Sequence, residues 1–114
     1  MTAASRYLAD MSAAISRIER YAVRGRSMFD SDELVRGWLE YQLILLGEAA
    51  RRLGEHDPPY HAAHPEIPWG PLIGMRNVRI HQYHRVDPDV VWNTVVNDLP
   101  PIRAAIDGLM FPQR

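Results

Sequence analysis

The chain has 114 residues, 46% of them hydrophobic and 24% charged, which is the composition of one ordinary globular domain with its own core. It contains no cysteine, so disulfides and thiolate metal sites are excluded. The net charge of −1 neither favours nor excludes an RNA partner. No apolar run is long enough to cross a bilayer, and the N-terminus lacks a signal-peptide core, so we expect a cytoplasmic protein.

The first predicted helix covers roughly residues 3–24. Its apolar residues recur at alternating spacings of three and four, as on one face of an amphipathic helix: Leu8, Met11, Ile15, Ile18 and Ala22. Gly25 is a natural left-handed stop. Three arginines, Arg17, Arg20 and Arg24, share another face. They could follow an RNA backbone, but a solvated face with cations near the helix C-terminus is the preferred interpretation.

The second predicted helix begins at Asp30. This residue can act as the N-cap, with Glu33 three positions later as in a capping box. Phe29 and Leu34 then occupy the two positions of a hydrophobic staple. Gly54 is the expected C-terminal stop.

One apolar stripe is expected to carry this helix into the core: Leu34, Trp38, Tyr41, Leu45, Ala49 and Leu53. Trp38 is therefore interpreted as a core or interface residue and not as a platform for stacking bases. Gly37 and Gly47 lie inside the helix, where glycine costs about 1 kcal/mol against alanine. They would fit positions where another helix approaches closely.

Residues 55–68 are rich in proline and histidine and form a predicted connection with at most one short helical turn. His56, His61 and His64 invite a metal site, but no acidic residue completes an evident ligand set, and we expect none. A third helix is predicted to start between Pro68 and Leu72 and to fade near His84.

The fourth predicted helix has Asp87 as its cap, Pro88 at its first position and Val86 with Val91 as a staple. Its core stripe is Val91, Val95, Leu99, Ile102, Ile106 and Leu109. Pro100 and Pro101 fall inside this stripe and predict a kink or break. The expected fold is one all-α domain over residues 1–114, an antiparallel bundle of four main helices.

The segment RNVRIHQYH, residues 76–84, has side chains suited to RNA cleavage. Histidine moves protons near neutral pH, and arginine neutralises a charged phosphate. On a straight helix, however, Arg76 and His81 are five residues apart, about 140° around the axis. They would meet one phosphate only through arginine's length, a fraying helix end or a second chain. A solvated helix face is the commoner explanation of such a composition.

The spacing Arg76–Asn77–x3–His81–x–Tyr83 resembles the R-x4-6-H motif of HEPN-superfamily ribonucleases, and in its longer R-x4-H-x-Y form that of HepT-like toxins. Further blocks resemble the same family in the same order: LGEAA at 46–50, PEIPW at 65–69, GMRN at 74–77 and VDPDVVWNTVVNDLP at 86–100. The resemblance implies an all-α homodimer in which two motifs face one cleft.

The resemblance also implies a toxin ribonuclease that needs neither metal nor cofactor and leaves a 2′,3′-cyclic phosphate. Arg76 and His81 are the implied catalytic residues, with Asn77 in support. The implied partner is a MntA-type nucleotidyltransferase antitoxin, which can transfer AMP to the motif tyrosine, here Tyr83. The family often has an aromatic residue after this tyrosine, where this chain has His84.

Three residues are candidates for RNA or cleft contacts: Arg79, His84 and Glu48. For Glu48, a structural ion pair is the preferred interpretation. A second hypothesis for the whole chain is a non-catalytic dimeric module that binds a nucleotide or the nucleotidyltransferase. The presence of Arg76, Asn77, His81 and Tyr83 together favours the ribonuclease.

Overall fold

The computed structural model describes residues 2–75 and 87–112, and every regular element in these two ranges is helical. The all-α class is therefore confirmed. The α-helices are α1 (Ala3–Ala22), α2 (Arg26–Ser31), α3 (Glu33–His56), α4 (Pro58–Ala63), α5 (Trp69–Gly74), α6 (Pro88–Asn93) and α7 (Leu99–Met110), with a π-helical segment, Thr94–Asp98, between the last two. The count of four main helices stays a prediction, because residues 76–86 lie outside the described ranges.

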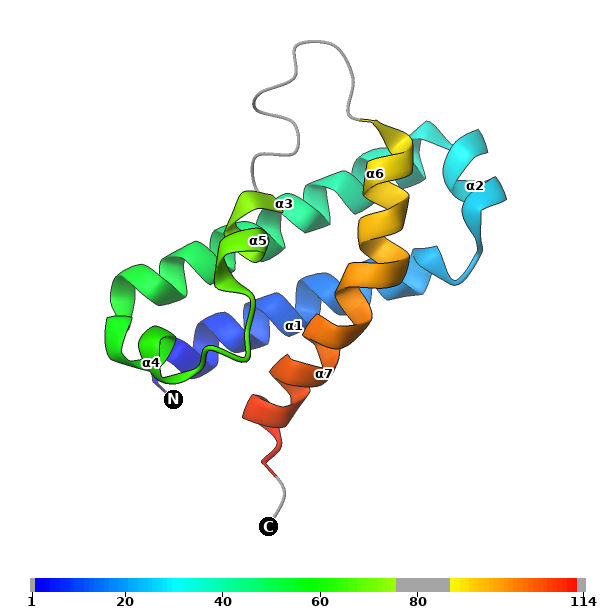
Figure 1. The fold of residues 1–114 in the computed structure, drawn as a ribbon. Helices are drawn as coiled ribbons and strands as arrows, with labels where there is room; N and C mark the ends of the chain where they lie inside the picture. Colours follow the sequence, from blue (N-terminus) through cyan, green and yellow to red (C-terminus); the bar gives the residue numbers. More distant parts are fainter. Residues whose placement is uncertain (1, 76–86, 113–114) are drawn as a thin grey trace.

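The two long helices, α1 and α3, run antiparallel and lie side by side (Figure 1). Thr2 caps α1 by accepting a hydrogen bond from the Ser5 amide at 3.0 Å, and Ser5 reciprocates. The predicted core stripe of this helix is buried except for Ala22, which is half-buried. The helix ends before Gly25, whose φ of 90° lies in the left-handed region that favours glycine.

The predicted start of the second long helix was wrong, because a separate short helix, α2, precedes it. Phe29 and Asp30 belong to α2, and α3 begins after Asp32, whose carboxylate accepts hydrogen bonds from the amides of Leu34 and Val35 at 3.0 and 3.3 Å. Asp30 fits the capping pattern in the sequence, but it lies inside α2, and Asp32 is the residue that caps α3. Leu34 is 81% exposed, so it does not form the predicted hydrophobic staple with Phe29.

The buried face of α3 also differs from the predicted stripe. The residues it buries are Val35, Leu39, Gln42, Leu43, Leu46, Gly47, Ala49, Ala50 and Leu53. Only Ala49 and Leu53 were predicted correctly, whereas Trp38 and Tyr41 are 40% and 49% exposed. Apolar residues occupy two neighbouring faces of this helix, so periodicity alone could not tell which face is buried.

The glycines of α3 behave differently from the prediction as well. Gly54 does not end the helix, which continues to His56. A Cβ on Gly37 would meet no atom within 4 Å, so no helix approaches closely there. Gly47 is buried.

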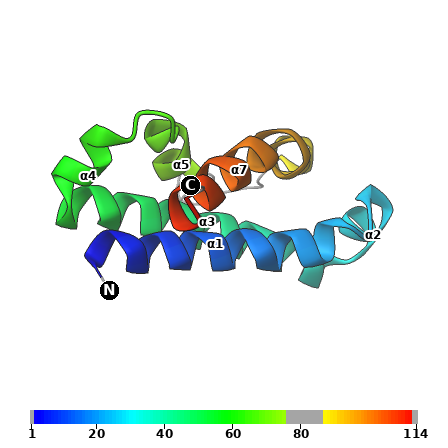
Figure 2. The ribbon, with the colours of Figure 1, turned by 90° about the horizontal axis from the view of Figure 1, so that it is seen from below.

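The remaining helices of the described ranges lie mainly on one side of the α1–α3 pair, apart from α2 at its end (Figure 2). Arg103 of α7 joins this layer to α1. Its guanidinium donates to the hydroxyls of Ser12 and Ser16 at 2.8 and 2.7 Å and pairs with Glu19 at 3.0 Å. These hydrogen bonds offset the cost of half-burying a charge and fix the place of α7 along α1.

The C-terminal helix begins as predicted and changes pitch where its prolines require it. Asp87 caps α6 by accepting from the Asp89 amide at 2.9 Å, with Pro88 at the first position. Pro100 and Pro101 have no amide hydrogen to donate to the preceding turn. The chain passes through the π-helical turn just before them, in which the Leu99 amide reaches back to the Thr94 carbonyl. The predicted core stripe stays buried, with Leu109 partly buried.

Candidate active site

The six motif residues predicted for catalysis, modification or RNA contact are Arg76, Asn77, Arg79, His81, Tyr83 and His84. All of them lie in residues 76–86, outside the described ranges, and so does Val86 of the predicted staple. Their roles remain predictions. The structure does describe the residues on both sides of the motif, which end α5 and begin α6, and these determine where the segment starts and finishes.

The chain enters the motif from α5, which packs on α3. Leu72 of this short helix and Met75, the residue after its end, are buried. The Trp69 indole donates to the His64 carbonyl at 3.0 Å, and its ring stacks on His61 with centroids 4.7 Å apart. The helix starts where the sequence predicted, and its packing holds Met75, the residue before Arg76, against the core.

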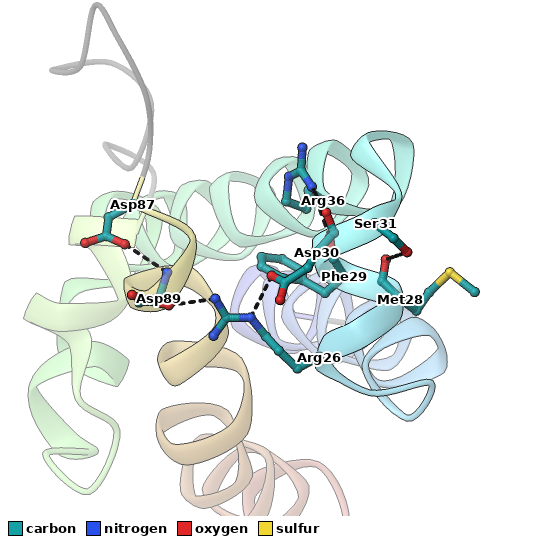
Figure 3. Close-up of polar contacts among 8 residues, drawn as sticks. All are labelled: Arg26, Met28, Phe29, Asp30, Ser31, Arg36, Asp87 and Asp89. Atoms are coloured by element: carbon teal, nitrogen blue, oxygen red, sulfur yellow. Dashed lines mark hydrogen bonds and ion pairs between the residues drawn. The ribbon is translucent and has the colours of Figure 1, made fainter.

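The chain leaves the motif into α6, which is held by α2 (Figure 3). The Arg26 guanidinium binds Asp89 of α6 at 2.6 Å and Asp30 of its own helix at 2.7 Å. The hydrogen bonds to Asp30 and then to Asp89 raise the pKa of Arg26 above its usual value. Phe29 packs on Trp92 with ring centroids 5.2 Å apart. Sequence reasoning missed Arg26, because nothing local relates it to a residue 63 positions away.

Glu48 forms the structural ion pairs that were the preferred interpretation. Its carboxylate accepts hydrogen bonds from Nε and Nη2 of Arg51 at 3.2 and 2.6 Å and from Nε of Arg52 at 3.3 Å. These hydrogen bonds raise the pKa of Arg51. Glu48 also lines a groove of about 270 Å³ between α1 and α3, together with Arg17 and Asp10. A contact between Glu48 and RNA remains a prediction.

The histidines around α4 make ring contacts. His56 stacks on Tyr7 with centroids 5.6 Å apart, and His64 contacts Tyr60 at 4.3 Å. His64 also binds Glu66 at 2.9 Å. Within residues 2–75 and 87–112, no three histidine, aspartate or glutamate side chains come close enough together to hold a metal ion. None of the helices described in these ranges is long and apolar enough to span a membrane.

Comparison with known proteins identifies the class. A family described as "Ribonuclease HepT-like" matches residues 11–109. A protein of Thermococcus cleftensis named "Probable ribonuclease HepT" is 32% identical over 90% of this chain and 92% of its own length. "Putative RNase MJ1380" of Methanocaldococcus jannaschii is 28% identical over 69% of this chain and 70% of its own. No solved structure matches the chain.

These matches define the protein as an enzyme of a ribonuclease family. The chain belongs to the HepT-like ribonucleases, as its motif and its other sequence blocks predicted.

Proposed function

We propose that the protein is a metal-independent endoribonuclease and the toxin of a HEPN/nucleotidyltransferase toxin–antitoxin pair, acting on mRNA or tRNA in the cytoplasm. The observation that carries this proposal is the family match over residues 11–109, which includes the complete Arg76–x4–His81–x–Tyr83 motif. The packing of α5 on α3 and of α6 on α2 supports it, because both ends of the motif segment are attached to a rigid helical framework.

The proposed reaction is transfer of the RNA phosphate within its own strand. His81 takes the proton of a 2′-hydroxyl as the 2′-oxygen attacks the adjacent phosphorus. The bond from phosphorus to the 5′-oxygen breaks, and this oxygen leaves with a proton. Arg76 neutralises the charge that builds up on the phosphoryl oxygens, and Asn77 holds the imidazole in one orientation. The products carry a 2′,3′-cyclic phosphate and a 5′-hydroxyl.

A homodimer with two motifs in one cleft is part of the proposal. Arg76 and His81 are separated by about 140° on a straight helix, so groups from two chains surround one phosphate more easily than groups from one. In such a cleft one histidine can act as the base while the other protonates the leaving oxygen. Arg79, His84 and Glu48 are then candidates to contact the RNA at its rim.

Tyr83 is proposed as the site of control by a MntA-type nucleotidyltransferase antitoxin. The tyrosine oxygen attacks the α-phosphorus of ATP, and pyrophosphate leaves. The resulting AMP-tyrosine adds a bulky group and a negative charge two residues from His81. It competes with the RNA phosphate for arginine and blocks the cleft.

Cleavage of total RNA and purified tRNA in EDTA, by the wild type beside Arg76→Ala and His81→Ala, tests the reaction. We expect the wild type alone to cut and to leave cyclic-phosphate ends. The matched control is His56→Ala, which removes a histidine that stacks on Tyr7 and should retain full activity. Mass spectrometry of the same samples excludes AMP already present on Tyr83. An unmodified wild type that cuts no RNA would reject the proposal in favour of a binding module.

A further inference from the structure

One edge of the α1–α3 pair combines exposed arginines with exposed aromatic rings. On α1, Arg17, Arg20 and Arg24 follow one another at helical spacing, and all three are exposed. They lie on a different flank of α1 from Glu19, which binds Arg103 of α7. In the described ranges, the helices above the α1–α3 pair therefore leave this edge open (Figure 2).

The aromatic rings come from α3. Trp38 and Tyr41 contact each other with ring centroids 6.3 Å apart and planes inclined by 41°. Arg17 donates to the side-chain oxygen of Gln42 at 3.4 Å, which places it beside the residue that follows Tyr41. Because α1 and α3 run antiparallel, one turn forward on α1 to Arg20 corresponds to one turn back on α3 to Trp38. The arginines and the rings therefore form two adjacent rows.

Acidic side chains lie near this row, since Asp10 and Glu48 line one groove with Arg17, but in the described structure neither of them forms an ion pair with it. Four other arginines bind carboxylates in the described structure: Arg26, Arg51, Arg52 and Arg103. Within residues 2–75 and 87–112, Arg17, Arg20 and Arg24 form no ion pair. Among the described residues, the Arg17 side chain donates to the neutral Gln42, and Arg24 lies over the Tyr21 ring at 5.0 Å. The row thus presents cations to solvent in a chain whose net charge is −1.

We propose that this basic–aromatic edge, made of Arg17, Arg20, Arg24, Trp38 and Tyr41, binds single-stranded RNA in addition to the contacts that the motif residues make with it. Arginine binds phosphates with release of counterions, and exposed rings stack on unpaired bases. The inference rests on the proposed function, because its ligand is the substrate of the ribonuclease. The edge would hold a single-stranded stretch of the RNA that the motif residues cut.

Charge favours RNA over a second copy of the chain as the occupant. A symmetric dimer through this edge would bring the same patch of each protomer together. Three arginines of one chain would then face three of the other, against one exposed carboxylate, Asp10, on the same described face of α1. Burying unpaired like charges is unfavourable, whereas RNA supplies one phosphate per nucleotide.

Binding is measured in the His81→Ala protein, so that the RNA stays uncut. Fluorescence anisotropy follows a labelled single-stranded RNA of about 12 nucleotides, within the range that single-strand sites cover. Arg20→Gln with Arg24→Gln should weaken binding and lower the slope of log affinity against log salt by about 1.4, near 0.7 per lost phosphate contact. Trp38→Ala should weaken binding about 5-fold or more and leave that slope unchanged.

Two controls match these changes in chemistry at residues outside the five that define the edge, and Arg6 lies about three turns of α1 before Arg17 on the same face. Arg6→Gln removes an exposed arginine near the start of α1, and Phe111→Ala removes an exposed ring beyond the end of α7. Both should bind RNA as the His81→Ala background does. The same RNA annealed to its complement should bind more weakly to the background protein, because pairing hides the base faces. Equal melting temperatures confirm that the variants are folded.

Unchanged RNA affinity in both edge variants would overturn the inference. So would a Trp38→Ala protein that sediments as a smaller species and binds RNA as before, because the edge would then be a contact between protomers. The two proposals fail separately. If the wild type cuts no RNA but the edge variants lose binding, the inference stands and the proposed reaction fails. If cleavage depends on His81 but the edge variants bind RNA as the background protein does, the proposed reaction stands and the inference about the edge fails.

Discussion

The guanidinium of Arg26 lies 2.6 Å from the carboxylate of Asp89, and this contact joins two short helices that are 63 residues apart in the chain. It acts beside the Phe29–Trp92 ring contact, and together they attach the start of α6 to α2 (Figure 3). Because α6 begins directly after residues 76–86, α2 fixes the far end of the segment that carries the motif.

Replacing Arg26 by glutamine should loosen the start of α6. We expect faster hydrogen exchange at the amides of Asp89 and Val91 in low salt, and a smaller difference from wild type in high salt, because exposed ion pairs are screened. Asp30→Asn is the control, since it removes the other partner of Arg26 and keeps the bond to α6. Equal exchange in wild type and Arg26→Gln at low salt would show that the ring contact alone holds the helix.

Asp32→Ala should destabilise the protein by about 1 kcal/mol, the usual cost of losing an N-cap. The reason is that the amides of Leu34 and Val35 lose the acceptor at the start of the longest helix. Asp30→Ala should cost less, because in the part of the chain that the structure describes its side chain caps no helix and its one ion pair is with Arg26. Urea unfolding of both variants checks the order, and a larger loss for Asp30→Ala would contradict it.

Leu39→Ala should destabilise the protein by about 3 kcal/mol, the typical cost of a cavity at a fully buried leucine. Leu34→Ala, on the same helix, should change stability by no more than about 0.5 kcal/mol, because its side chain is in solvent. Chemical denaturation measures both. Similar losses at the two positions would mean that Leu34 is buried in solution, for example in an assembly, and the loss would then vary with protein concentration.

Gly37→Ala should stabilise the protein by up to about 1 kcal/mol, because alanine favours the helix interior and its Cβ would meet no atom within 4 Å. Gly54→Ala is the matched comparison. Its Cβ would lie 3.1 Å from Cδ2 of His61, so the ring must shift and the gain should be smaller. Thermal melting of the two variants distinguishes them, and a larger gain at Gly54 would contradict the packing of α4 on α3.

Acid should weaken the contact between His64 and Glu66. The hydrogen bond from His64 lowers the pKa of Glu66 below its usual value, so the folded state binds that proton less readily than the unfolded chain. The contact therefore stabilises the fold above the usual glutamate range, and its contribution is lost as pH falls through the lowered pKa. Carbon-13 NMR titration of Glu66 should show its pKa rise in His64→Phe and stay unchanged in His56→Phe.

The sequence predicts α1, the starts of α5 and α6, and the helical class well, because each depends on a local signal. The cap at Asp87 followed by Pro88 identifies its helix without any knowledge of the fold. The start of α3 could not be resolved in this way, since Asp30 fits the capping pattern in the sequence but lies inside α2. The buried face of α3 depends on tertiary packing, which selects Leu39 over Trp38.

In the candidate site, too, features with a local sequence signal could be predicted, and features that depend on tertiary contacts could not. The motif from Arg76 to Tyr83 could be recognised because its spacing is typical of one family, and the family that it indicated is confirmed. The roles of its residues stay predictions. The ion pairs of Glu48 follow from arginines three and four positions later on one helix. The contacts of Arg26 with Asp89 and of Arg17 with Gln42 join distant parts of the chain, so no local sequence pattern predicts them.

The bonds of Arg103 to Ser12 and Ser16 have a consequence for how the protein is made. They join α7 to α1 across 91 and 87 residues, so the second flank of α1 is covered only after α7 has been synthesised. Until α7 leaves the ribosome, part of the apolar face of α1 remains in water, where chaperones and proteases can reach it. A chain cut short before α7 should therefore be cleared quickly, which limits release of enzyme from incomplete translation.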